Sequence, residues 1–512
     1  MPPHILPKSL FCITLKTVEG LVNTACINIE ERYGNYDSNK CQQAVQCVQQ
    51  YLLSNIPGLV LDEVCEERNN NVGLHCSRVH DGRISLAVYM HNNMRTFTVG
   101  ETKHNVCVDD NFWISHLSRL HNLIALDLHL MCTDEILEVV GNTCIKLEDI
   151  NIVSRLAPEQ VKINARCETF NALKLRFFIS DKGLSYLSNC KYLKKITMNK
   201  MLRSNFGGRM MTDAGIRKLV KSLPNIQAIS YDDMGVILSE DMDDVESIPL
   251  QYLSDHHPAS SHIKAASRLC KNLQHLCLHL PNLAYDQRLK ASEILDVLTS
   301  SDLNVQTLEL YQFPCSPEFF ALLKVKGNSL ITLILQTNSP ICATSVRFIG
   351  ENCPNLKSLQ LKEVVASPQQ DYEQCERQYS FNSEPLFCNL RCLYVWGSKW
   401  NPDVILPLCL THAKEMEYLT LLKANDYRFL DEVMAKVLRN NPLTNLKSIQ
   451  MFTGCLVSLT TLRYFIKYCP DLAELSFTKH SDIKNKDIKE IYDEIRLNNL
   501  DLRVCSVEGG DR

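Results

Sequence analysis

The sequence contains no apolar run that approaches the ~20 residues needed for a helix to span a bilayer. Its first residues, MPPHILPKSLFC, lack the long apolar core of a secretory signal peptide. Lysine and arginine (54) nearly balance aspartate and glutamate (58), and the formal charge of -4 leaves no positive excess to attract a phosphate backbone. These absences predict a cytoplasmic or nuclear protein that binds neither nucleic acid nor membrane.

Motifs of the common enzyme classes are also missing. The sequence has no GxxxxGK phosphate loop, no GxGxxG after a strand, no HExxH and no nucleophile elbow. It has no CxxC pair, the nearest approach being Cys388 and Cys392, so the spacing of zinc fingers and ribbons is absent. The sequence therefore predicts a protein that is not an enzyme and that holds no cofactor and no metal.

What the sequence does have is a repeat of three apolar residues, in which the first and second are separated by two residues and the second and third by one. Most copies start 23 to 34 residues apart. The first apolar positions of the thirteen copies are Leu123, Leu147, Phe170, Leu193, Ile226, Leu273, Val305, Leu330, Leu356, Leu390, Met416, Leu446 and Leu472. A unit of this length cannot bury its own apolar face, so the units are expected to stack into a solenoid.

Cysteines account for part of the same pattern. In the clearest copies a cysteine stands three residues before the first leucine, namely Cys144, Cys190, Cys270, Cys353 and Cys469. A small apolar side chain fits a tight turn that enters a buried strand. We therefore interpret many of the 23 cysteines as reduced and structural.

A helical phrase precedes several of the predicted strands. It begins at Ser180 or Thr212 as an N-cap and continues with Asp and Gly, as in TDAGI from Thr212. This phrase resembles the TDxGL phrase of the cysteine-containing class of leucine-rich repeats. The resemblance implies an α/β fold, a leucine-rich-repeat solenoid with a concave parallel sheet and convex helices.

Domain boundaries follow from where the repeat pattern begins and ends. We expect a helical module at 1–70, a linker and capping repeat at 71–110, the solenoid at 111–490, and a closing cap with a frayed tail at 491–512. An irregular first strand is expected at 84–88. Two repeats are overlong, with an acidic insertion around 232–246 and a polar loop at 366–385.

The acidic insertion allows two interpretations. A solvated loop is the simpler one, because charge runs usually face water. A partner-binding role is the alternative, since neighbouring repeats carry a set of basic residues that could also pair with the insertion: Lys191, Lys194, Lys195, Lys200, Arg203 and Arg209.

The N-terminal module contains two phrases typical of partner-binding helices. In SLFCITLKTV, an amphipathic stripe at helical spacing consists of Leu10, Thr14, Val18 and Leu21. In NIPGLVLDEV, a proline suited to a first helical turn stands among apolar residues, namely Ile56, Pro57, Leu59 and Val64. A plain helical cap on the solenoid is the alternative interpretation.

In this order the two phrases resemble the elongin-binding box and the cullin box of elongin-dependent ubiquitin-ligase receptors, particularly the leucine-rich PRAME and ZYG types. Thr14 stands where that family usually has cysteine, and the armadillo repeats of the ZYG type are absent. A second resemblance is to the F-box with leucine-rich repeats, which also opens with Leu-Pro, as Leu6 and Pro7 do, although the tryptophan-bearing end of that motif is missing. Either resemblance implies a substrate receptor that binds elongin C or the Skp adaptor together with a cullin; a scaffold with no ligase link is the alternative.

Substrate is expected on the concave face, because alternate residues of each strand point there. Exposed aromatic side chains are favoured contacts at protein interfaces. The candidate substrate-binding residues are Tyr311, Tyr394, Trp396, Phe452, Asp127, His129, His275 and His279; the same face should also carry Glu309, Gln360, Lys362 and Gln450. His275, Cys277 and His279 alternate on one strand, but with no acidic partner evident we interpret them as ordinary polar surface.

Overall fold

The chain folds into two compact units, residues 8–253 and 254–512, each built from parallel strands that alternate with helices. The computed structural model describes residues 10–34, 36–58, 60–64, 82–98, 110–128, 132–152, 179–198, 211–281, 286–337, 341, 343–362, 385–397, 402–423, 428–452, 455–479, 483, 485–498 and 500–508.

The first unit opens with helices and continues into short strands. Its helices are α1 (Leu10–Tyr33), α2 (Asn39–Asn55), α4 (Gly82–Tyr89), α5 (Asp110–Leu117), α6 (Asp134–Thr143), α9 (Asp181–Leu187), α10 (Asp213–Ser222) and α11 (Met234–Ser239). Its strands are β1 (Thr96–Thr98), β2 (Ala125–Asp127), β3 (Asp149–Asn151), β4 (Lys195–Thr197) and β5 (Ala228–Ser230), while β6 (Tyr252–Asp255) crosses the boundary between the units.

The second unit has longer strands. Its helices are α12 (Ser260–Leu269), α13 (Asp286–Ser300), α14 (Pro317–Lys326), the 3-10 turn η2 (Gly327–Ser329), α15 (Ala343–Asn352), α17 (Pro402–Leu410), α18 (Asp431–Asn440), α19 (Leu459–Tyr468) and α20 (Asn485–Leu497). Its strands are β7 (His275–His279), β8 (Thr307–Tyr311), β9 (Thr332–Gln336), β10 (Ser358–Lys362), β11 (Cys392–Gly397), β12 (Tyr418–Lys423), β13 (Arg428–Phe429), β14 (Ser448–Phe452), β15 (Cys455–Leu456), β16 (Glu474–Lys479) and β17 (Arg503–Glu508).

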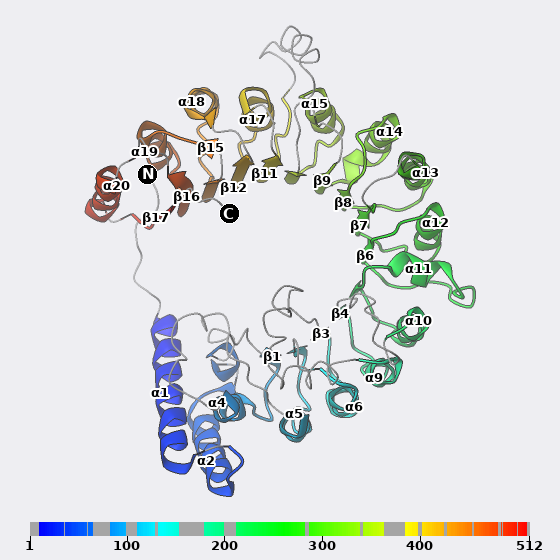
Figure 1. Ribbon diagram of the computed structural model, residues 1–512, viewed down its shortest axis with the longest axis vertical. Helices are drawn as coiled ribbons and strands as arrows, with labels where there is room; N and C mark the ends of the chain where they lie inside the picture. Colours follow the sequence, from blue (N-terminus) through cyan, green and yellow to red (C-terminus); the bar gives the residue numbers. More distant parts are fainter. Residues whose placement is uncertain are drawn as a thin grey trace, which may run out of the picture. The chain divides into compact units, whose positions relative to one another are not determined.

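Within each unit the strands line the concave side and the helices cover the convex side (Figure 1). Neighbouring strands pair in parallel and in register, so that Leu308 lies beside Leu333 and Leu333 beside Leu359. Along β8, β10 and β14, buried side chains alternate with half-exposed ones. The leucines therefore point into the layer between strands and helices, and the residues between them point to the concave surface. The predicted α/β leucine-rich-repeat fold is confirmed.

Helix capping links neighbouring repeats where the TDxGL phrase occurs. The Asp134 carboxylate accepts hydrogen bonds from the backbone N–H (2.8 Å) and the hydroxyl (2.5 Å) of Ser180, the N-cap of α9. Asp181 in turn accepts from the N–H and hydroxyl of Thr212, both at 2.7 Å, at the N-cap of α10. A Cβ on Gly215 would overlap the Asp181 carboxylate, which explains why glycine stands in this phrase.

Two expectations about strands need correction, and a third is untested. Residues 84–88 belong to helix α4 rather than to a strand, and the first described strand is β1. The copy at Phe170 lies outside the described residues, and β3 pairs directly with β4. The long spacing after Ile226 contains an additional strand, β6, whose Tyr252 pairs with Ala228 of β5.

Candidate functional site

The N-terminal helices pack as a module in which α1 contacts both α2 and α4. The buried face of α1 is formed by side chains three or four residues apart: Leu15, Val18, Val22, Cys26 and Ile29. Gln49 of α2 donates hydrogen bonds to the carbonyls of Ala87 and Met90 at the end of α4, at 3.1 and 2.5 Å. Tyr36, between α1 and α2, lies 2.9 Å from Nε2 of His116 on α5, and so connects the module to the first repeats.

The residues of the first predicted box divide between the two faces of α1. Val18 is 8% exposed and faces the module's core, whereas Thr14 and Leu21 are exposed, Leu21 by 65%. Leu10 begins the helix, and its side chain lies outside the described part. Thr14 and Leu21 are therefore the two members of the predicted stripe whose described side chains a partner can reach.

The second predicted box follows α2. Ile56 is half-buried, Pro57 is exposed, Val64 is buried and Leu59 lies outside the described residues. Helical residues 60–64 turn part of their surface inward, since Leu61, Asp62 and Val64 are all buried. Asp62 accepts a hydrogen bond from the Arg95 N–H at 3.1 Å and so ties this segment to β1.

Tyr51 is an exposed residue of the module that the sequence analysis missed. Its side chain on α2 is 69% exposed, and among the described residues of the module only Tyr51 and Leu21 are exposed large apolar side chains. Helical spacing could have indicated this exposure. Cys41, Val45 and Leu52 form the buried stripe of α2, and Tyr51 lies beside that stripe rather than in it.

On the concave face of the second unit, polar and aromatic side chains of β7 and β8 form a cluster. His275 Nε2 lies 2.8 Å from Glu309 Oε1, and the Tyr311 hydroxyl donates to Glu309 Oε2 at 2.8 Å. The His279 and Tyr311 rings stack with centroids 4.0 Å apart. Glu309 is thus the acidic partner of His275 that the sequence alone did not identify.

The Glu309 carboxyl is held ionised by this cluster. Burial by itself raises the pKa of Glu309, but the hydrogen bonds from His275 and Tyr311 outweigh it, and the net pKa is lowered. No group of three or more His, Cys, Asp or Glu side chains in the described part of the chain is arranged to hold a metal ion.

The predicted aromatic residues lie on the same concave face, on β11 and β14. Tyr394 and Trp396 are half-buried, and burial raises the pKa of the Tyr394 hydroxyl. Trp396 pairs in register with Leu422 of β12, and Leu422 with Phe452 of β14. Leu422, which the sequence analysis missed, therefore joins Trp396 and Phe452 into one continuous apolar row.

Of the predicted substrate-binding residues that the structure describes, Asp127 lies in the first unit, on β2. Its carboxylate accepts a hydrogen bond from Asn151 Nδ2 at 2.9 Å. His129 lies outside the described residues.

The repeat cysteines occupy the interior, as predicted. Cys144, Cys190, Cys270, Cys353 and Cys469 are fully buried and free. The Cys190 thiol lies 3.6 Å from the Cys144 carbonyl of the previous repeat, to which it donates. Burial raises the pKa of the Cys144, Cys270 and Cys353 thiols to about 12, so that they stay protonated and unreactive.

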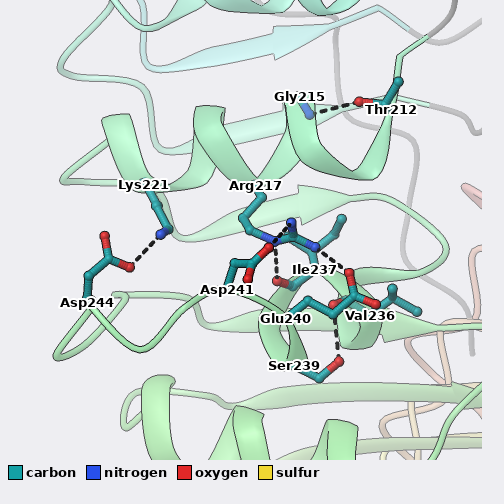
Figure 2. Close-up of polar contacts among 10 residues, drawn as sticks. All are labelled: Thr212, Gly215, Arg217, Lys221, Val236, Ile237, Ser239, Glu240, Asp241 and Asp244. Carbon is teal, nitrogen blue, oxygen red and sulfur yellow. Dashed lines mark hydrogen bonds and ion pairs between the residues drawn. The ribbon is translucent and has the colours of Figure 1, made fainter.

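The acidic insertion folds back onto its own repeat (Figure 2). Arg217 of α10 donates to the Ile237 carbonyl at 3.3 Å and to Glu240 at 2.8 Å, and it also pairs with Asp241 at 3.4 Å. Lys221 pairs with Asp244 at 2.5 Å. These acidic side chains are therefore used within the fold.

The neighbouring basic residues have other partners. Lys194 pairs with Glu148 and Lys195 with Asp149, at 2.7 and 3.3 Å, while Lys191 donates to the Ser222 carbonyl at 3.1 Å. Lys200, Arg203 and Arg209 lie outside the described residues. Among the described contacts, the basic residues Lys191, Lys194 and Lys195 therefore do not pair with the acidic insertion.

No helix in the described ranges is both long and apolar enough to cross a membrane. No protein-family model matches the sequence. Among solved structures, the chain is similar to one in the crystal structure of a complex of Rad7 and Elc1 in yeast, with a TM-score of 0.44 and 10% sequence identity. That alignment covers 94% of this chain and 96% of the other.

Proposed function

We propose that this protein is a non-catalytic substrate-recognition subunit of a cullin-RING ubiquitin ligase. In this proposal the N-terminal helices bind an adaptor, elongin C in the first place and the Skp adaptor as second choice, and the adaptor connects the chain to a cullin. The concave face of the second unit captures the substrate. A leucine-rich-repeat scaffold with a helical cap and no ligase link is the alternative.

The adaptor role is supported by the difference in exposure between the two faces of α1. Leu15, Val22, Cys26 and Ile29 fix the inner face in the module, while Leu21 on the outer face is 65% exposed. When a partner covers an apolar side chain that is so exposed, the free energy of binding becomes more favourable. Leu21 lies three residues, about one helical turn, beyond Val18, the last residue of the phrase that resembles an elongin-binding box.

Two buried residues of the same module favour the alternative function, a helical cap on the solenoid. Val18 and Val64, two residues of the box phrases, are buried against the module's own helices. A capping function needs only this inward packing, whereas adaptor binding also needs the outward face.

A binding experiment on α1 distinguishes the two functions. The full chain and its Leu21→Asp variant are titrated with purified elongin C and, separately, with the Skp adaptor. Because loss of one apolar contact at an interface centre costs about 2 kcal/mol, we expect Leu21→Asp to weaken binding about thirtyfold. Leu497→Asp, the same change at a side chain of α20 that is 86% exposed, is the matched control and should bind as the unchanged chain does.

Two results would reject the ligase role in favour of the cap. One is that the unchanged chain binds neither adaptor. The other is that Leu21→Asp binds as tightly as the Leu497→Asp control while both keep the circular dichroism spectrum of the unchanged chain.

A further inference from the structure

One line of side chains crosses the concave face of the second unit at the carboxyl ends of its strands. The register pairs place these residues side by side on β7, β8, β9 and β10, and again on β11, β12 and β14. Between β10 and β11 the last printed pair is Leu361 with Val395, and Lys362 and Trp396 are the residues that follow it. We call them the concave row: His279, Tyr311, Gln336, Lys362, Trp396, Leu422 and Phe452. Each is half-exposed.

The length of the concave row matches an extended peptide. Seven neighbouring strands are separated by six steps of ~4.8 Å, so the row is about 29 Å long. An extended chain rises ~3.3 Å per residue, so about nine residues lie along it.

Carboxamide side chains beside the row suit an extended backbone. Such a backbone has no internal hydrogen bonds, and each of its N–H and C=O groups needs a partner. Gln336 lies in the row, and Gln360 and Gln450 lie on the same face two residues before Lys362 and Phe452. All three are half-exposed, and a carboxamide both donates and accepts.

Charge is distributed unevenly along the row. The Lys362 ammonium lies 5.3 Å from the centroid of the Tyr311 ring, and between described residues it forms no ion pair. The nearby carboxylate of Glu309 is already bonded to His275 and Tyr311. An acidic group of a ligand would therefore be stabilised most when it lies beside the Lys362 ammonium.

Beyond Lys362 the row becomes apolar. Trp396, Leu422 and Phe452 follow on consecutive paired strands, and apolar or aromatic side chains of a ligand would bury their exposed surface. From Lys362 to Phe452 there are three strand steps, which correspond to about four residues of an extended peptide.

We propose that the concave row binds an extended segment of the substrate in which an acidic residue opposite Lys362 is accompanied, within four residues on one side, by aromatic or long aliphatic residues. This inference rests on the proposed function, because it specifies the substrate class of the same face. A folded domain, by contrast, would not need its contacts in this linear order.

The test uses the full chain and a degenerate library of nine-residue peptides that samples every amino acid except cysteine at each position. We expect bound peptides to be enriched in Asp or Glu at one position and in Trp, Phe, Leu or Met within four residues of it. Lys362→Glu should replace the acidic preference with Lys or Arg, and Trp396→Ala should weaken binding of an enriched peptide by about tenfold or more. Lys357→Glu, at an exposed lysine just before β10, should leave both preferences unchanged.

The inference is overturned if the unchanged chain enriches no such peptide, or if Lys362→Glu keeps the preference for acid. Adaptor binding is measured on the same preparations. Peptide selection without adaptor binding would reject the ligase role and keep the peptide site, whereas adaptor binding without peptide selection would do the reverse.

Discussion

At the scale of single residues, the glycines of the TDxGL phrases have a steric cause. Gly183 and Gly215 each lie against a carboxylate of the preceding repeat, Asp134 and Asp181 respectively, which leaves no space for a Cβ. The same carboxylates bond the N-cap residue of the next helix. A glycine and an aspartate in adjacent repeats therefore act as one unit.

Replacing Gly215 by alanine should push the Asp181 carboxylate away from Thr212. The loss of these cap hydrogen bonds, together with the steric overlap, should lower the free energy of unfolding of the surrounding repeats by about 1 to 3 kcal/mol. Gly20→Ala is the control, because the added Cβ on this glycine of α1 would meet no atom within 4 Å, and the change should raise the free energy of unfolding by about 0.5 to 1 kcal/mol. Urea unfolding followed by circular dichroism measures both; equal effects of the two changes would contradict this explanation.

The sequence predicted residues whose role is set by one strand or one turn. The leucines of the repeat and cysteines such as Cys353 were found because burial at a fixed spacing leaves a periodic pattern. The partner of His275 was not found, because Glu309 lies 34 positions further on and is brought close only by strand register. Contacts across strands depend on loop lengths that the repeat pattern leaves open.

At the scale of elements, the acidic insertion shows how an overlong repeat keeps its packing. Helix α11 begins just after Asp233, and Ile237 and Leu238 bury their side chains. Arg217 is only 10% exposed at its side chain and holds the end of α11 through the Ile237 carbonyl and Glu240. Residues 234–239 of the insertion are therefore a folded part of the solenoid, whereas the acidic side chains that follow, such as Asp241 and Asp244, face solvent.

Arg217→Ala should loosen α11 locally. It leaves the Ile237 carbonyl and Glu240 without the guanidinium, at a cost of about 1 to 2 kcal/mol, which should speed amide hydrogen exchange in 234–240 by about five- to thirtyfold. Lys221→Ala removes a more exposed pair, which solvent screens, and should change the exchange rates less. Unchanged exchange in Arg217→Ala would show that apolar packing alone holds the helix.

Two elements were predicted wrongly in type or missed. Residues 84–88 alternate weakly and were expected as a strand, yet they form helix α4, which packs on α1 and α2. Tertiary packing of this kind overrides a short local pattern. Strand β6 was missed because Leu253 stands in a segment without the three-residue apolar repeat.

At the scale of the whole molecule, the two proposed binding surfaces belong to different units. Leu21 and Tyr51 lie in residues 8–253, whereas Tyr394 and Trp396 lie in residues 254–512. Substitutions that share no contacts and no partners are usually additive.

A double change, Tyr394→Ala with Trp396→Ala, should therefore abolish capture of enriched peptides and leave adaptor binding within about twofold of the unchanged chain. Both side chains are half-buried, so the thermal midpoint should fall by no more than about 4 °C. Calorimetry and adaptor titration of the same variant supply the two controls. A much larger fall in the midpoint would place these aromatics in the core instead of on a binding surface.

The order of the cap residues along the chain has a consequence for synthesis. Asp134 precedes Ser180, Asp181 precedes Thr212 and Asp431 precedes Ser458, so in each pair the accepting carboxylate is translated before the group that it receives. For these three helices, the nascent chain leaving the ribosome thus already contains the carboxylate that the N-cap residue will bond. A chain shortened from its amino end, in contrast, would start on a helix whose cap partner was never made.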